Sequence, residues 1–149
     1  MTKTGLIPAT AALTALLGAC DRGPAPPEKT VQQLMAQEVQ PTADIYWKSV
    51  QYISDETGEH DIFPKTDEEW ARVKAAATRL GEHGALLQTP GYAEGRGEDW
   101  IQFSKSLVEV SNLAEQAAAE KSTDKVFEVG GTIYQVCSGC HQVYPPAAG

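Results

Sequence analysis

The segment S-T-D-K-V-F-E-V-G-G-T-I-Y-Q-V-C-S-G-C-H-Q-V-Y, residues 122–144, is the most informative part of this chain for predicting the fold. Its apolar residues recur at steps of three and four, the repeat of an amphipathic helix with one buried face. That face comprises Val126, Val129, Ile133, Val136, Cys140 and Val143. A second stripe on the same helix comprises Phe127, Gly131, Tyr134, Cys137, His141 and Tyr144. An ordinary surface helix has one apolar stripe, so the second one needs another cover.

Three earlier segments show the same repeat of apolar residues. No segment keeps a period of two, and no hairpin signal separates two strand-like runs, so no strand is expected. The residues between the repeats, 55–65 and 89–97, are expected to form loops. Long helices with this repeat pack nearly antiparallel. The sequence therefore predicts an all-α protein, an antiparallel four-helix bundle, with helices near residues 30–53, 66–88, 98–121 and 122–144.

Two of these helices carry a clear start signal. Thr30 with Gln33, and Thr66 with Glu69, each fit the capping-box pattern at a helix N-terminus. Pro41 interrupts the first helix, and a proline inside a helix removes a backbone hydrogen bond. A kink or a short break is therefore expected at that residue.

The first twenty residues differ in composition from the rest. Lys3 is followed by an apolar run from Leu6 to Ala19, a secretory-signal pattern too short to span a membrane. The run ends in L-G-A-C, residues 17–20, which resembles the lipobox of bacterial lipoproteins, where the cysteine is lipidated. Ordinary secretion is the alternative. The expected organisation is a signal peptide at 1–19, a Pro-rich tether at 20–29 and a folded domain at 30–149.

This organisation predicts a periplasmic protein that is held to a membrane by a lipid on Cys20. In enterobacterial lipoproteins, an aspartate in the position of Asp21 resembles an inner-membrane retention signal, which favours that membrane. The net charge is −8, and residues 1–20 carry one lysine and no acid, so the remainder carries −8 − 1 = −9. An acidic chain without a basic stripe is not expected to bind nucleic acid.

The C-S-G-C-H motif at residues 137–141 carries the chemistry. On a helix, Cys137, Cys140 and His141 stand at i, i+3 and i+4 and share one side. C-x-x-C-H is the attachment motif of c-type haem: each thiol bonds one vinyl group, and the imidazole reaches the iron. A flat apolar macrocycle also covers the second stripe, so both features predict one covalent haem c.

Three other uses of these residues explain less of the pattern. A thioredoxin-like C-x-x-C belongs in a βαβ setting, which is not predicted here. A structural zinc site has four ligands, and only His60 or His83 is left as a fourth. A disulfide is compatible with an exported chain but leaves His141 without a role.

At this point the chain resembles the class II c-type cytochromes, cytochrome c-prime and its Met-ligated low-spin relatives. The residues that carry the resemblance are G-G-T-I-Y-Q-V-C-S-G-C-H-Q-V-Y (130–144) and, more loosely, T-V-Q-Q-L-M (30–35). The sequence departs from the family at Ser138, Gly139, Gln142 and Val143, where basic residues are frequent. The resemblance implies an exported four-helix bundle with His141 as the proximal iron ligand, and homodimers are frequent in such bundles.

The sixth ligand decides between two functions. By the resemblance, Met35 stands where the low-spin relatives place their methionine, and a thioether ligand favours electron transfer. An ordinary core methionine is the alternative, and it would leave a five-coordinate iron that binds nitric oxide or carbon monoxide. His83 and His60 are weaker candidates for this position. Tyr134 and Tyr144 are candidates to pack on the haem. No nucleophile–base pair suggests an enzyme, so the expected function is single-electron transfer with a redox partner that the sequence does not identify.

Overall fold

The structure is a computed structural model that describes residues 26–146, so the predicted signal peptide and Cys20 lie outside the described residues. Most of the described chain is helical, with one small two-stranded sheet. The elements in chain order are α1 (Val31–Leu34), η1 (Met35–Val39), α2 (Gln40–Trp47), β1 (Gln51–Asp55), β2 (Gly58–Ile62), α3 (Asp67–Leu87), α4 (Pro90–Ala93), α5 (Glu98–Ala119) and α6 (Thr123–Val143). None of the helices within residues 26–146 is long and apolar enough to cross a membrane.

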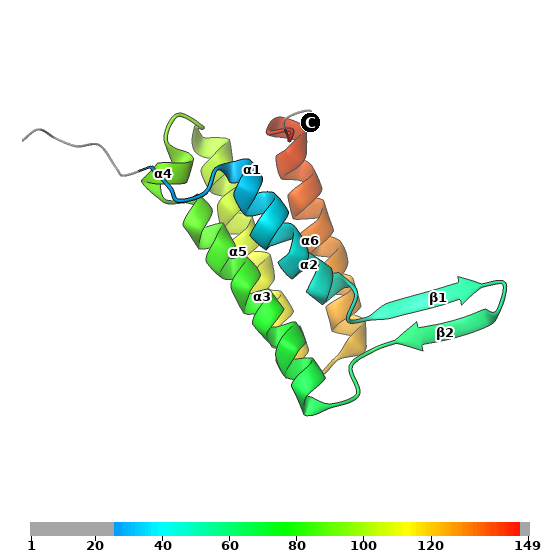
Figure 1. The fold of residues 1–149 in the computed structure, drawn as a ribbon. Coiled ribbons are helices and arrows are strands. Elements are labelled where there is room, and N and C mark those ends of the chain that lie inside the picture. The colour runs from blue at the N-terminus through cyan, green and yellow to red at the C-terminus, as the bar shows by residue number, and fades with distance from the viewer. Residues whose placement is uncertain (1–25, 147–149) are drawn as a thin grey trace, which may run out of the picture.

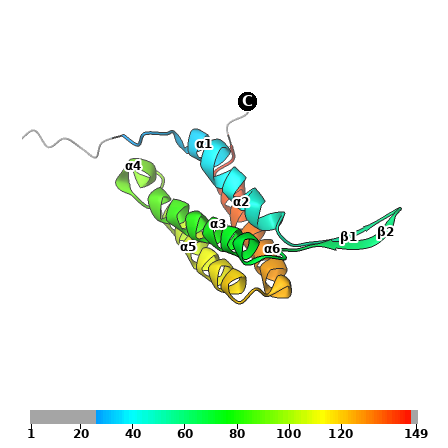
Figure 2. The ribbon, with the colours of Figure 1, turned by 60° about the horizontal axis from the view of Figure 1, so that its bottom comes forward.

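The long helices lie side by side and alternate in direction along the chain (Figure 1). Helix α3 packs along α5, α5 packs along α6, and α2 contacts both α3 and α6. Figure 2 shows the segment 31–47 crossing one side of this group. We call α1, η1, α2, α3, α5 and α6 together the helical body. Its most buried large side chains are Tyr46, Leu80, Ile133 and Val126.

Both predicted capping boxes are confirmed. The Thr30 hydroxyl accepts the Gln33 N–H, and the Gln33 side chain accepts the Thr30 N–H. Thr66 and Glu69 make the same reciprocal pair at the start of α3. Each pair satisfies two backbone N–H groups that a helix start leaves without a partner, which fixes where these helices begin.

At Pro41, where the sequence predicts a kink or a short break, the chain stays helical and widens into a π-helix, η1. The N–H of Gln40 donates to the carbonyl of Met35, five residues earlier. In an α-helix, the ring of Pro41 would press on the carbonyl four residues before it. The wider turn that precedes Pro41 relieves that crowding, and it places Met35 at the first position of η1.

The prediction that the first helix continues to Ile53 is wrong. Helix α2 ends at Trp47, and the Ser49 hydroxyl donates to the Tyr46 carbonyl at 2.6 Å, which satisfies an acceptor at the helix end. The chain then forms an antiparallel hairpin in which Gln51 pairs with Ile62 and Asp55 with Gly58.

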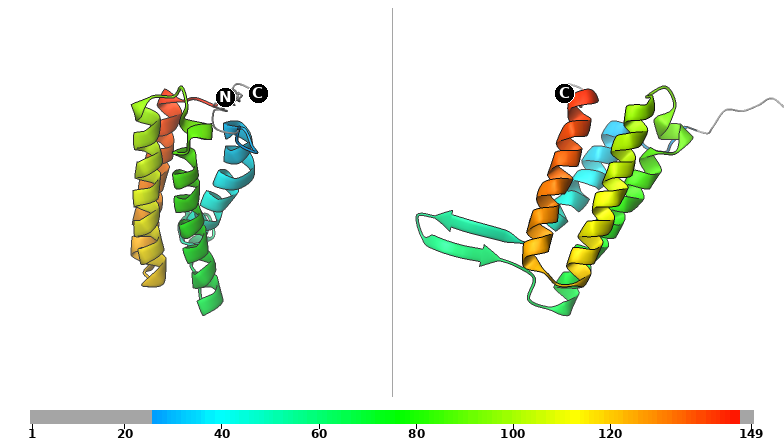
Figure 3. Two further views of the ribbon diagram at one scale, coloured as in Figure 1. Left: turned by 90° about the vertical axis from the view of Figure 1, so that its left-hand side faces the viewer. Right: turned by 180° about the vertical axis from the view of Figure 1, so that it is seen from behind.

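The prediction of no strand is therefore also wrong. The Asp55 carboxylate accepts the N–H and the hydroxyl of Thr57 in the turn, and Gly58 takes φ 117° there. The expected loop at 89–97 likewise contains the short helix α4. Figure 3 shows the hairpin extending away from the helical body, with α4 at the opposite end of the molecule.

Candidate functional site

The last turns of α6 hold the C-x-x-C-H residues in place. The Ser122 hydroxyl caps the start of the helix by accepting the Lys125 N–H, and the Tyr144 N–H donates to the Cys140 carbonyl at 2.8 Å. The helix is continuous between these two bonds, so Cys137, Cys140 and His141 keep the i, i+3, i+4 relation that the sequence predicts. All three side chains line one cavity.

This cavity has a volume of about 750 Å³ and lies between the N-terminal helical segment, α5 and the end of α6. Its volume is within the ordinary range for sites that bind organic cofactors. Its walls are mainly apolar, and we call it the α6 cavity. It is lined by Val31, Gln32, Met35, Ala36, Val39, Gln40, Ala43, Trp47, Leu87, Arg96, Trp100, Phe103, Ser104, Leu107, Val136, Cys137, Cys140, His141, Val143, Tyr144, Pro145 and Pro146.

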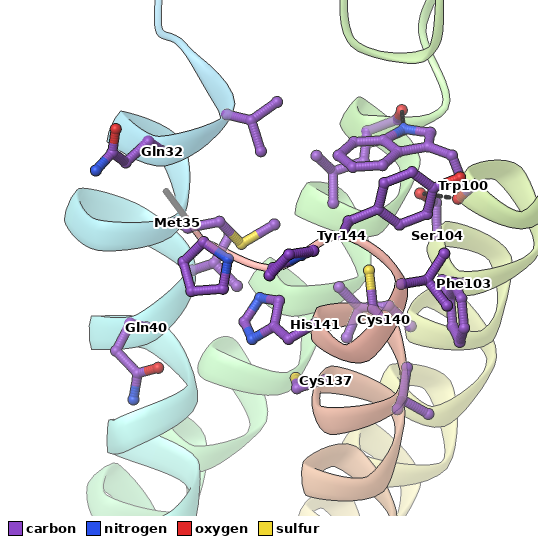
Figure 4. Close-up of a pocket in the computed structure, with 18 of the residues that line it drawn as sticks. Gln32, Met35, Gln40, Trp100, Phe103, Ser104, Cys137, Cys140, His141 and Tyr144 are labelled. Atoms are coloured by element: carbon purple, nitrogen blue, oxygen red, sulfur yellow. Dashed lines mark hydrogen bonds between the residues drawn. The ribbon is translucent and has the colours of Figure 1, made fainter. Parts of the chain in front are cut away.

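Met35 and His141 reach the α6 cavity from different elements. In Figure 4, the Met35 side chain extends from its helix toward α6, and the His141 imidazole extends from α6 toward Met35's helix. Met35 is half-buried, and His141 is exposed. A thioether and an imidazole therefore share one cavity. Single π-turns occur frequently at functional sites, and here η1 carries the thioether.

The two thiols of the α6 cavity are not joined in a disulfide. Both are half-buried, and burial raises the pKa of each thiol above its ordinary value; for Cys137, the neighbouring Cys140 raises the pKa further. Reactive C-x-x-C pairs have lowered pKa values, because the thiolate is the attacking species. The environment of this pair therefore favours the neutral thiol.

Aromatic side chains form the wall beside Cys140. The Trp100 indole donates to the Leu87 carbonyl at 2.7 Å, and the Tyr144 ring meets it edge-on with centroids 5.1 Å apart. A Cβ on Gly139 would lie 3.3 Å from the Phe103 ring, so the C-x-x-C segment lies close against α5. Tyr144, a candidate to pack on the haem, thus lines the α6 cavity.

Tyr134 lies elsewhere. Its ring packs edge-on against Trp47, with centroids 6.4 Å apart, and it is 64 % exposed. It lines a separate cavity of about 410 Å³ near the base of the hairpin, together with Tyr52 and Phe127. The predicted second stripe of α6 is therefore divided, and only its last three members, Cys137, His141 and Tyr144, line the α6 cavity.

The other two histidines are also outside the α6 cavity. His60 is exposed on β2, and His83 is buried on α3, where it lines a third cavity near α4. Burial is the main reason that the pKa of His83 is lowered. Within residues 26–146, no three His, Cys, Asp or Glu side chains converge into a group that holds a metal ion on its own.

The sequence interpretation did not single out Arg96, Phe103 or Trp100 as site residues. Phe103 and Trp100 are part of the α5 repeat, which predicts core positions and does not distinguish a core wall from a cavity wall. Arg96 lies in the loop that precedes α5, four residues before Trp100. Because Arg96 lies outside the helix, that spacing is no helical signal, and no pattern in the sequence points to this residue.

Comparison of the chain with protein-family models, curated proteins and solved structures gives no match.

Proposed function

We propose that this chain is an exported c-type cytochrome that carries single electrons. It holds one haem c through Cys137 and Cys140, with His141 as the proximal ligand and Met35 as the sixth ligand. The observation that carries the proposal is the meeting of both thiols, the imidazole and the thioether of these residues in one apolar cavity. Such donors, arranged in that motif, are those of a Met-ligated c-type haem.

The residues of the α6 cavity suit the group chemically. The thiols lie in an apolar wall and are unpaired, so they are free to form thioether bonds. When bound, the haem supplies an iron that changes oxidation state by one electron. The chain orients the imidazole from α6, brings the thioether from η1, and keeps much of the surroundings apolar. A thioether ligand and an apolar shell both raise the reduction potential.

The helical body is compatible with the four-helix bundle expected of such a cytochrome. With α1, η1 and α2 counted as one helix, the body has four antiparallel segments, which supports the interpretation as a four-helix bundle with the attachment helix last. The signal pattern and Cys20 support export to the periplasm and a lipid anchor in the membrane.

Two rival functions are separable from this one. A thiol-redox module uses only the two cysteines, so it leaves His141 and Met35 without a role in the α6 cavity. A five-coordinate haem that binds nitric oxide or carbon monoxide shares the whole attachment site and differs only in the absence of a Met35–iron bond. Met35 is therefore the residue to test.

The experiment compares holoprotein, made in a host that attaches haem c, with two variants. Met35→Leu removes the thioether at nearly constant volume. The double variant Leu34→Met/Met35→Leu keeps the composition and moves the thioether to a buried residue of the same helix that does not line the cavity. We expect the protein to retain haem after denaturation, to be low-spin in the ferric state, and to become high-spin in both variants.

Two other outcomes would contradict the proposal that Met35 ligates a haem iron. A native high-spin spectrum that Met35→Leu leaves unchanged, with rapid carbon monoxide binding, establishes the gas-binding alternative. A purified chain with the mass of its amino acids alone contradicts the cytochrome proposal altogether.

A further inference from the structure

Arg96 is the one permanently charged side chain in the lining of the α6 cavity. The lining contains no Asp, Glu or Lys, and its other titratable side chains are Cys137, Cys140, His141 and Tyr144. The whole chain has 20 acidic residues and 12 lysines and arginines. The lining of the α6 cavity, with an arginine and no acidic residue, has the opposite charge balance. The charge of the cavity wall is therefore complementary to an anionic group.

The position of Arg96 is fixed from three sides. Its Nη1 donates to the Tyr92 carbonyl at 2.7 Å, and its guanidinium lies over the Trp100 ring at 4.8 Å from the centroid. The Tyr144 hydroxyl donates to the Arg96 carbonyl at 2.6 Å. The glycines on both sides take positive φ, 76° at Gly95 and 84° at Gly97, which allows the tight loop that presents the side chain.

The guanidinium keeps unused capacity for binding. Among residues 26–146, Arg96 forms no ion pair, and its only side-chain hydrogen bond is the one to Tyr92. By contrast, Arg79, on α3, faces the Glu38 carboxylate. An arginine has five N–H donors in a planar fork that fits a carboxylate in a bidentate manner. A carboxylate at the cavity would find such a fork already oriented by Trp100.

We propose that Arg96 binds a propionate carboxylate of the haem. This inference rests on the proposed function, because the propionates are the anionic groups that a haem brings into an otherwise apolar cavity. Arg96 then has two effects on the holoprotein. Its positive charge favours the ferrous state, which carries less positive charge, and it lowers the pKa of the propionate that it faces.

The main alternative is that Arg96 only packs on Trp100. Arg96→Met keeps an unbranched side chain on the indole and removes the charge. Arg96→Lys keeps the charge and removes the planar fork. Arg72→Gln removes an exposed arginine of α3 that does not line the α6 cavity, and it serves as the matched control. Covalent haem content is measured first for every variant, so a failure of the cytochrome proposal is recognised before Arg96 is judged.

Reduction potential is then measured against pH on the haem-loaded proteins. With the propionates ionised, Arg96→Met is expected to have a lower potential than the unaltered protein, with its redox-linked titration shifted to higher pH. Arg96→Lys is expected to stay closer to the unaltered protein, and Arg72→Gln to match it. If Arg96→Met loads haem normally but keeps both the potential and the titration unchanged, the inference is wrong.

Infrared difference spectra of the unaltered holoprotein provide a test that does not depend on any variant folding. The carboxyl band of one propionate is expected to titrate below the range of an Asp or Glu in water. If both propionates titrate within that range, the inference is overturned even when Arg96→Met cannot be isolated.

Discussion

At the scale of single residues, His83 has an unusual environment on α3. Its Nε2 is one of two buried side-chain polar atoms within residues 26–146 that have no hydrogen-bond partner; the other is Oγ of Ser111. Burial disfavours the imidazolium, and the cationic Arg79 disfavours it further, while Glu38 and Glu82 act in the opposite direction with less effect. The net result is a lowered pKa for His83 in the folded state.

This gives a signed prediction for stability against pH. Because the unfolded chain takes up a proton near pH 6.5 and folded His83 does so only at lower pH, the free energy of unfolding falls as the pH is lowered from about 7.5 to 5.5. One proton limits this slope to about 1.4 kcal/mol per pH unit. His83→Gln is expected to flatten the slope in denaturant unfolding, and His60→Gln, in the exposed hairpin, is expected to keep it. Equal slopes for His83→Gln and the unaltered protein would contradict this assignment.

The spacing of the C-x-x-C-H motif predicts which of its side chains lie together. The i, i+3, i+4 relation brings Cys137, Cys140 and His141 to one cavity, because any continuous helix does so. Met35, which is proposed as the sixth ligand, also lines that cavity. Tyr134 does not, because Trp47 packs across α6 and donates its indole N–H to the Gly130 carbonyl at 2.9 Å. The repeat of apolar residues along one helix cannot reveal such a contact with a residue of another helix.

At the scale of helices and strands, adding a methyl group at two different glycines is expected to change the stability in opposite directions. A Cβ on Gly84 would lie 2.9 Å from Cγ2 of Val108 and 3.0 Å from the Ser104 carbonyl oxygen, so α3 and α5 approach closely there. On Gly131 of α6, a Cβ would have nothing within 4 Å. Gly84→Ala is therefore expected to lower the free energy of unfolding by about 1–3 kcal/mol, since neighbouring backbone cannot easily move aside.

Gly131→Ala is the matched control, since it adds the same methyl group to an open helix position. It is expected to raise the free energy of unfolding by up to about 1 kcal/mol, through helix propensity alone. Both values come from denaturant unfolding of the holoprotein. A Gly84→Ala variant as stable as the unaltered protein would show that the two helices separate there at little cost.

Helix boundaries follow from the sequence where caps define them, as at Thr30 and Thr66. The hairpin could not be predicted because Tyr52 and Ile53, the apolar residues of β1, continue the three-and-four spacing of the preceding helix. The sequence therefore reads as a longer helix there. Both strands are short. Every residue of β2, Gly58–Ile62, is exposed, so this strand lacks the alternation of apolar and polar residues that marks a half-buried strand. The π-helix η1 could not be predicted either. Pro41 indicates that the helix is irregular, but a proline does not determine whether the helix kinks, breaks or widens.

At the scale of the whole molecule, the two ends of the helical body differ. The first described residues, α4 and the end of α6 lie at one end, and the hairpin projects from the other (Figure 1). The Tyr92 hydroxyl donates to the Lys29 carbonyl at 2.9 Å, and Lys29 pairs with Glu38. These three residues line the third cavity, near α4, so the end of the predicted tether is attached there, at the same end of the body as the end of α6.

The proposed anchor makes a prediction at this scale. Cys20→Ser removes the lipidated side chain and is expected to move the haem-loaded protein from the membrane fraction to the soluble periplasmic fraction. Asp21→Ser keeps the cysteine, so it is expected to stay in a membrane fraction, with any change confined to the choice between inner and outer membrane. Immunoblots of separated fractions measure both. Retention of Cys20→Ser in the membrane would refute lipid anchoring through this residue.

The attachment of Lys29 determines how an anchored molecule would stand on the bilayer. From Cys20 to Pro26 the chain reaches at most about 22 Å, even when fully stretched. The end of the body that carries α4 and the end of α6 would then lie nearest the lipid headgroups, and the acidic hairpin, with Asp55, Glu56, Glu59 and Asp61, would point into the aqueous space (Figure 1). The residues of the α6 cavity at the end of α6 would then lie nearer the membrane than the hairpin does.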